Sequence, residues 1–133
     1  MTSRRAVSVM GSTGSIGCSA LDVIQYENQR GGAGFDVIAL TAGSNVEKLA
    51  EQALECRPQI AVIADETQLP ILKDRLAGSG IEAAGGAAAV TEAAMRPARV
   101  LAAIVGAAGL ESTLAAVQAG NDVAIANKES VVC

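Results

Sequence analysis

Short apolar runs alternate along the chain with amphipathic segments. The apolar runs are rich in Val, Ile, Leu and Ala and span residues 7–10, 35–40, 60–64, 81–84, 100–105 and 123–126. The amphipathic segments, which we expect to be helices, span residues 15–29, 44–54, 67–76, 87–95 and 111–119. Continuous apolar runs of this length are typical of strands that are buried on both faces. The alternation therefore predicts an α/β fold: a Rossmann-like, doubly wound, mostly parallel sheet with helices on both faces.

A glycine-rich turn, Gly11-Ser-Thr-Gly14-Ser-Ile-Gly17, lies between the first predicted strand and the first predicted helix. We expect Gly11 to take the positive φ of a tight turn, and Gly17 to let the helix pack closely on the sheet. The missing side chain of Gly14 would let a pyrophosphate approach the N–H groups at the helix start. This order predicts a dinucleotide-binding site; the alternative is a glycine-rich turn without a ligand. A Walker P-loop is excluded, because no Lys-Ser or Lys-Thr pair closes the turn.

Polar and glycine-rich segments follow the predicted strands at one edge of the sheet, where ligands of such folds bind. These segments are residues 11–17, 41–45, 106–109 and 127–130. Asp36 begins its strand, so it lies at the wrong end of the sheet to accept a hydrogen bond from a ribose 2′-OH. The correct end carries Ser44 and Asn45 and no carboxylate that would repel a 2′-phosphate. This pattern favours NADP over NAD.

The segment after Gly43 also predicts a helix start. Ser44-Asn-Val-Glu47 matches a capping box, with Ser44 as the N-cap residue. Lys48, in the first turn, would either add positive charge to the site or lie on a solvated face. Glu47, Glu51 and Glu55 follow at intervals of four residues, which predicts a solvated helix face rather than a metal site.

Composition narrows the function classes. The chain has 133 residues, half of them apolar, and a net charge of −4, which argues against nucleic acid as a partner. No uncharged apolar stretch reaches the length of a membrane span, so we expect no membrane insertion. The cysteines, Cys18, Cys56 and Cys133, form no CxxC pair, which predicts reduced thiols in the cytoplasm.

Four motifs, GSTGSIG, AGSN, AAIVGAAGL and ANKES, occur in this order over essentially the whole chain. Together they resemble the 1-deoxy-D-xylulose 5-phosphate reductoisomerase family of the non-mevalonate isoprenoid pathway. The resemblance implies isomerisation and reduction of 1-deoxy-D-xylulose 5-phosphate to 2-C-methyl-D-erythritol 4-phosphate, with NADPH and a divalent metal (Mg²⁺, Mn²⁺ or Co²⁺). Members of this family are much longer than this chain. We therefore expect residues 1–133 to be the N-terminal NADPH-binding domain of a homodimeric parent, without its catalytic and C-terminal domains and inactive alone.

The resemblance also implies roles for individual residues. The cofactor would be contacted by Thr13, Gly14, Ser15 and Ile16 at the pyrophosphate, by Gly43, Ser44 and Asn45 at the 2′-phosphate ribose, and by Asn127 and Glu129. Lys128 would reach the substrate. No catalytic residue and no metal ligand is expected within the chain. Many members of the family carry Lys where Ser44 stands, and a serine can hydrogen-bond a phosphate but cannot neutralise it.

Two other readings of the sequence differ in class. Another NADP-dependent oxidoreductase, of the dihydrodipicolinate reductase or homoserine dehydrogenase kind, would share the glycine turn but not ANKES. A non-enzymatic nucleotide-sensing module would be complete at 133 residues. The chain ends at what reads as an opening helix, which predicts a longer parent protein.

Overall fold

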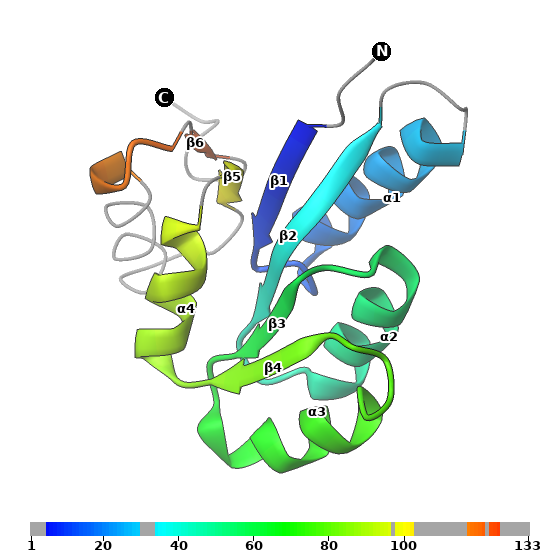
Figure 1. Ribbon diagram of the computed structural model, residues 1–133, viewed down its shortest axis with the longest axis vertical. Coiled ribbons are helices and arrows are strands. Elements are labelled where there is room, and N and C mark those ends of the chain that lie inside the picture. The colour runs from blue at the N-terminus through cyan, green and yellow to red at the C-terminus, as the bar shows by residue number, and fades with distance from the viewer. Residues whose placement is uncertain (1–4, 30–33, 97, 103–116, 122, 126–133) are drawn as a thin grey trace.

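The computed structural model describes residues 5–29, 34–96, 98–102, 117–121 and 123–125 (Figure 1). In this part of the chain, six strands form one parallel sheet in the order β4-β3-β2-β1-β5-β6. The first four strands extend the sheet outward from its centre in one direction, and the chain then returns to the other side of β1. This reversal confirms the predicted Rossmann-like, doubly wound fold and places its switch point between β1 and β5.

The elements follow the predicted alternation closely. The strands are β1 (Arg5–Met10), β2 (Phe35–Ala42), β3 (Ile60–Ile63), β4 (Glu82–Gly85), β5 (Arg99–Ala102) and β6 (Val123–Ile125). The α-helices are α1 (Ser15–Gln29), α2 (Val46–Cys56), α3 (Leu69–Arg75) and α4 (Ala87–Met95). Most of the helix predicted at residues 111–119, the end of the strand predicted at 100–105 and the segments 106–109 and 127–130 lie outside the described residues.

The segment predicted as one helix at residues 67–76 is divided in two. A single 3-10 turn, η1 (Glu66–Gln68), precedes α3, and Pro70 lies in the first turn of α3, where proline is tolerated. The Asp65 side chain caps η1, because its Oδ1 accepts hydrogen bonds from the Thr67 amide at 3.1 Å and from the Thr67 hydroxyl at 2.6 Å. This cap accounts for the division, because it holds residues 66–68 in the tighter 3-10 turn. The α-helix then begins at Leu69, beside Pro70.

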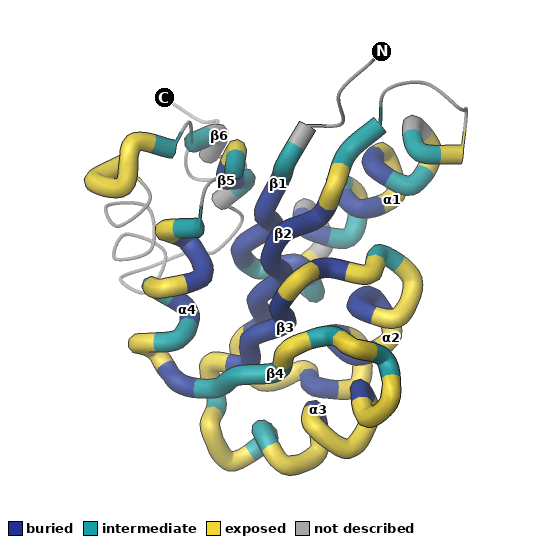
Figure 2. The backbone as a smooth tube through the Cα atoms, in the orientation of Figure 1, coloured by how far each residue is buried: buried dark blue, intermediate teal, exposed yellow. Residues whose placement is uncertain are grey.

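Helices cover both faces of the sheet, as Figure 1 shows: α1, α2 and α3 lie on one face and α4 on the other. Each face has its own core, and both cores appear as buried segments in Figure 2. Because side chains alternate along β1, Val7 and Val9 pack toward α1 and α2, whereas Met10 packs toward α4. In the described part of the chain, the sheet is thus buried between two helical layers.

An irregularity in β2 changes the alternation of its side chains between the two faces of the sheet. Val7 of β1 is paired with Val37, but the next residue of β1, Ser8, is paired with Ala39, so Ile38 forms a bulge. The bulge lets both Val37 and Leu40 reach the same core although they lie three residues apart. It also sets the register in which Met10, the last residue of β1, meets Thr41.

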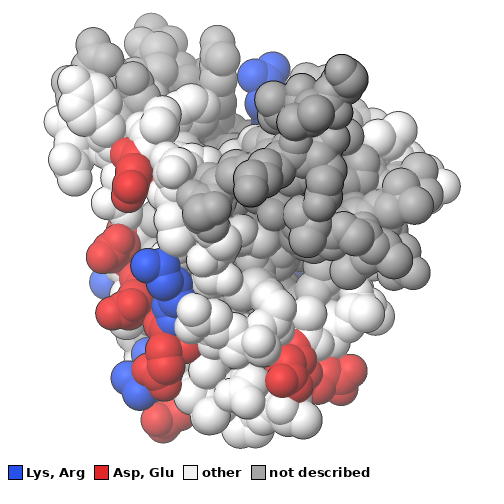
Figure 3. All heavy atoms as spheres, turned by 180° about the vertical axis from the view of Figure 1, so that it is seen from behind, with Lys and Arg blue, Asp and Glu red and all other residues white. Residues whose placement is uncertain are grey.

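Charged side chains gather on the side of the molecule where α2 and α3 lie, with both signs interspersed (Figure 3). Glu47, Glu51 and Glu55 are all exposed, which confirms the predicted solvated face of α2. Among the helices that the structure describes, none is both long enough and apolar enough to cross a membrane.

Candidate functional site

The glycine turn is attached directly to the end of the neighbouring strand. The amides of Gly11 and Ser12 both donate to the carbonyl oxygen of Thr41, at 3.0 and 2.8 Å, and the Gly11 amide also reaches the Thr41 hydroxyl at 3.0 Å. Gly11 has a φ of 85°, so its predicted left-handed conformation is confirmed. The chain therefore turns sharply after β1 while it remains bound to the carboxyl end of β2.

The other two glycines of the turn differ in what they do. A Cβ atom at Gly17 would lie 2.3 Å from the Gly11 carbonyl oxygen and 2.6 Å from the Ser12 Cα atom. Gly17 is therefore required because α1 packs on the turn itself, whereas the sequence predicted close packing on the sheet. A Cβ atom at Gly14 would meet only the Gly11 oxygen, at an ordinary 3.7 Å. Gly14 is exposed and lies outside the left-handed region, so the fold itself does not require glycine there.

Ser12 of the glycine turn and Gln52 of α2 form a buried polar pair. The hydroxyl of Ser12 donates to Gln52 Oε1 at 2.8 Å, and Gln52 Nε2 donates to the Ser12 carbonyl oxygen at 2.8 Å. Cys18 lies beside this pair, where its thiol donates to the carbonyl oxygens of Ser12 and Thr13 at 3.7 and 3.6 Å. The sequence analysis missed Gln52. Its signal was a polar residue beside Leu49 and Ala53 on the apolar stripe of the helix.

The loop between β2 and α2 forms the second half of the edge. Gly43, Ser44 and Asn45 are all exposed. The prediction of Ser44 as N-cap is wrong: α2 begins at Val46, and Asn45 Oδ1 accepts from the Lys48 amide at 3.3 Å. In the described part of the chain, the Ser44 hydroxyl makes no hydrogen bond and is free to meet a ligand.

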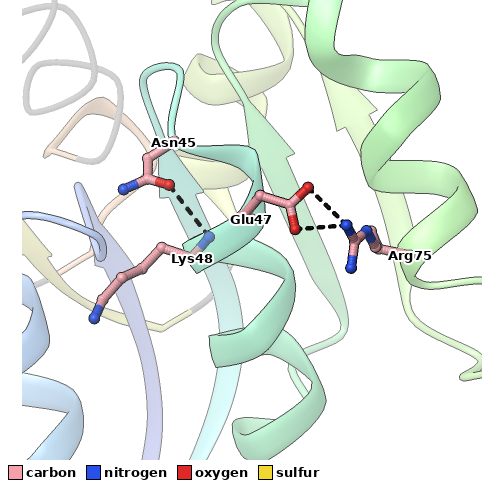
Figure 4. A network of polar contacts seen from close by, with 4 residues as sticks. All are labelled: Asn45, Glu47, Lys48 and Arg75. Atoms are coloured by element: carbon pink, nitrogen blue, oxygen red, sulfur yellow. Dashed lines mark hydrogen bonds and ion pairs between the residues drawn. The ribbon is translucent and has the colours of Figure 1, made fainter.

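Glu47 does not complete the predicted capping box. Its carboxylate pairs with the guanidinium of Arg75 from α3, at 2.7 and 2.9 Å, instead of reaching back to Ser44 (Figure 4). Lys48 extends from α2 away from this pair, and its exposed side chain lines the groove between α1 and α2 beside Cys18. The first turn of α2 therefore carries one neutralised carboxylate and one ammonium group that makes no ion pair within the described ranges.

The carboxylates near β2 are directed away from the loop. Asp36 lies at the amino end of β2, which confirms its predicted position far from Thr41. Asp65 follows β3 and supports the loop through its backbone, because its amide donates to the Gly43 carbonyl oxygen at 2.9 Å. Its carboxylate is held by Thr67. An anionic ligand at residues 43–45 would therefore meet hydroxyl, amide and N–H groups from this strand end.

Cys56 lies at the far end of the same groove. Burial raises the pKa of the Cys56 thiol; the hydrogen bond from Gln25 opposes this shift, and the nearby charge of Glu55 adds to it. The thiol is therefore neutral at physiological pH.

Several predicted site residues lie wholly or partly outside the described part of the chain. Ser15 and Ile16 open α1, but their side chains lie outside what the structure describes, as do Asn127, Lys128 and Glu129 entirely. Thr13 and Gly14 lie in the turn, and Gly43, Ser44 and Asn45 in the facing loop. No group of three or more Cys, Asp or Glu side chains that could hold a metal ion occurs among the described residues.

A parallel doubly wound sheet, with a glycine turn and an uncharged second loop at the carboxyl ends of adjacent strands, defines an α/β domain of the Rossmann type. The sequence model of the family "1-deoxy-D-xylulose 5-phosphate reductoisomerase" matches residues 7–133. The chain belongs to this family. Membership decides against the dihydrodipicolinate reductase and homoserine dehydrogenase kinds.

Curated relatives support the assignment. The 1-deoxy-D-xylulose 5-phosphate reductoisomerase of Rhodospirillum centenum is 55% identical over 130 residues, which are 97% of this chain and 31% of the relative. That of Caulobacter vibrioides is 53% identical over 134 residues, which cover 100% of this chain and 33% of the relative. The chain spans about a third of the length of the curated relatives that it matches.

Solved structures agree with the fold. The Zymomonas mobilis reductoisomerase in complex with NADPH superposes with a TM-score of 0.87 at 52% identity, over 97% of this chain and 33% of that one. A DOX-P reductoisomerase in complex with magnesium gives a TM-score of 0.83 at 36% identity, over 98% of this chain and 32% of that one.

The glycine turn makes a prediction about stability. Gly17→Ala should lower the free energy of unfolding by about 2 kcal/mol or more, because the new methyl group meets backbone atoms that cannot move aside. This loss would exceed the gain of about 1 kcal/mol that alanine normally brings to a helix. Chemical denaturation measures it, with Gly14→Ala as the matched control, which should lose less than about 1 kcal/mol. Equal stability of Gly17→Ala and the wild type would contradict the close packing of α1 on the turn.

Proposed function

We propose that this chain binds NADPH as the cofactor domain of a 1-deoxy-D-xylulose 5-phosphate reductoisomerase. The parent enzyme would isomerise 1-deoxy-D-xylulose 5-phosphate and reduce the product to 2-C-methyl-D-erythritol 4-phosphate. Family membership and the NADPH complex of the Zymomonas mobilis relative support this proposal. When bound, NADPH would supply the hydride for the reduction. The parent would act as a homodimer in the cytoplasm, and the free thiols of Cys18 and Cys56 are compatible with a reducing compartment.

The observation that carries the proposal is the exposed Gly14. Gly11 needs its positive φ and Gly17 its close packing, but Gly14 has neither reason to be glycine. Gly14 is the N-cap residue of α1, where Ser, Asn or Asp would serve at least as well, so an exposed glycine there is suited to close approach by a phosphate. We infer that the pyrophosphate lies over Thr13, Gly14 and the opening residues of α1, Ser15 and Ile16.

The loop at residues 43–45 would bind the adenosine end of the cofactor. Gly43, Ser44 and Asn45 lie at the carboxyl end of the strand next to the turn, where a Rossmann domain holds the ribose. The Ser44 hydroxyl would donate to the 2′-phosphate. Lys48 would add positive charge from the first turn of α2. Asn127 and Glu129 would lie by the cofactor and Lys128 by the substrate, and these roles are carried over from the family resemblance alone.

The divalent metal of the family does not fit the described part of this chain. The relative solved with magnesium is about three times as long as this chain, and the described acidic residues form no cluster that could bind a metal. We propose that the metal ligands and the catalytic groups belong to other domains of the parent enzyme. Residues 1–133 would then bind and orient the cofactor only.

The first prediction of this proposal concerns Gly14. Gly14→Val should abolish detectable NADPH binding in isothermal titration calorimetry while the protein remains folded, because a branched side chain would occupy the space of the pyrophosphate. Circular dichroism and thermal unfolding would verify the fold. A folded Gly14→Val protein with the NADPH affinity of the wild type would refute the assignment of the site.

The second prediction concerns cofactor preference. Ser44→Asp should weaken NADPH binding by about 1–2 kcal/mol through like-charge repulsion and leave NADH almost unaffected. Because Asn45 caps α2, the substitution leaves the cap in place. Ser44→Asn is the neutral control of equal size. If NADPH and NADH weaken to the same extent in Ser44→Asp, the loop does not read the 2′-phosphate.

The third prediction concerns activity. The purified 133-residue chain, given 1-deoxy-D-xylulose 5-phosphate, NADPH and Mn²⁺, should show no oxidation of NADPH above background, because a metal is needed to polarise the substrate oxygens. Calorimetry with Mn²⁺ should reveal no tight site. Turnover would place the catalytic groups within these residues and overturn the proposed division of the enzyme.

A further inference from the structure

Gln52 is a buried amide that makes two hydrogen bonds to a single residue of the glycine turn. Its Oε1 accepts from the Ser12 hydroxyl and its Nε2 donates to the Ser12 carbonyl oxygen, both at 2.8 Å. Ser12 is fully buried, and Gln52 is only 8% exposed. The same Nε2 lies 3.5 Å from the Cys18 sulfur, so both ends of the amide are occupied.

Stability alone does not explain a glutamine at this position. Its neighbours on the buried face of α2 are Leu49, Ala50 and Ala53, and an apolar side chain of similar size would continue that face. Burying an amide is unfavourable unless all its groups are hydrogen-bonded, and even then the net gain from each bond is small. What the amide adds is direction, because its donor and acceptor fit only one orientation of the Ser12 peptide.

The hydrogen-bonded pair of Ser12 and Gln52 connects the two loops of the proposed site, residues 11–17 and 43–45. The turn is bound to β2 through Thr41 and to α2 through Gln52. The facing loop ends at Asn45, which opens the same helix about two turns before Gln52. The helix therefore carries a ligand loop at its start and a side chain that holds the opposite ligand loop at its middle.

We propose that Gln52 is a positioning residue, which fixes the glycine turn relative to the loop at residues 43–45 so that one dinucleotide reaches both. This inference rests on the proposed function and adds a residue that does not itself touch the ligand. A ligand that spans both loops benefits from their fixed separation, because the two loops lose no conformational freedom when the ligand binds. A ligand that uses only the loop at residues 43–45 gains nothing from it.

Gln52→Met is the principal test, since it keeps the length of the side chain and removes both hydrogen bonds. We expect its dissociation constant for NADPH to rise about tenfold, and that for adenosine 2′-monophosphate to change less than twofold. Global stability should fall, because the buried hydroxyl of Ser12 loses its partner, and amide exchange of a peptide covering residues 11–17 should accelerate more than that of the remaining strands and helices. Gln25→Met is the matched control, because Gln25 lines the same groove but bonds to Cys56 instead of the turn.

The outcomes separate this inference from the proposed function. If wild-type protein fails to bind NADPH, the proposed function fails, and amide exchange of the turn still decides whether Gln52 holds it. An unchanged NADPH affinity in folded Gln52→Met, an equal weakening of both ligands, or unchanged exchange of the turn would each overturn the inference. If Gln52→Met does not fold, Ser12→Ala removes one of the two bonds and should show the same pattern at smaller amplitude.

Discussion

The carbonyl oxygen of Thr41 is the contact on which the site depends. Two consecutive amides of the glycine turn donate to it, so the end of β2 fixes where the chain leaves β1. That position in turn sets the start of α1, which packs so closely on the turn that only glycine fits at position 17. A shift of one residue in the β1–β2 register would separate these partners. The bulge at Ile38 therefore has a consequence for the site, because it brings Met10 opposite Thr41.

Much of this arrangement could be predicted from the sequence because the signals are local. The turn is defined by its glycines between an apolar run and a helix, and the parallel sheet is defined by the alternation of elements. The predicted N-cap of α2 is wrong by one residue. Ser44 and Asn45 are both good N-cap residues, and the prediction favoured Ser44 because Glu47 lies three residues after it. Glu47 is drawn to Arg75, which lies 28 residues away, and no local rule reports such a contact.

Gln52 and the bulge in β2 were missed for a related reason. A glutamine within a helix that also carries Glu47, Glu51 and Glu55 reads as part of the solvated face, although its position falls among the apolar ones. Its partner, Ser12, lies 40 residues away, inside a motif in which the glycines and not the serine form the recognisable pattern. The bulge leaves no trace in a run of apolar residues, because each of them is compatible with either face of a sheet that is buried on both sides.

The electrostatics of the site are set at short range and not by the net charge. The chain carries a charge of −4, yet the proposed ligand is an anion. Charges on exposed groups are screened within about 8 Å at physiological ionic strength, so the net charge of the whole chain acts weakly at the two loops. Near the loop at residues 43–45, Glu47 is paired with Arg75 and Asp65 is held by Thr67. The N-termini of α1 and α2 and the ammonium group of Lys48 provide positive charge near the two loops. An acidic protein can thus bind an anion, because the groups close to the ligand matter more than the net charge.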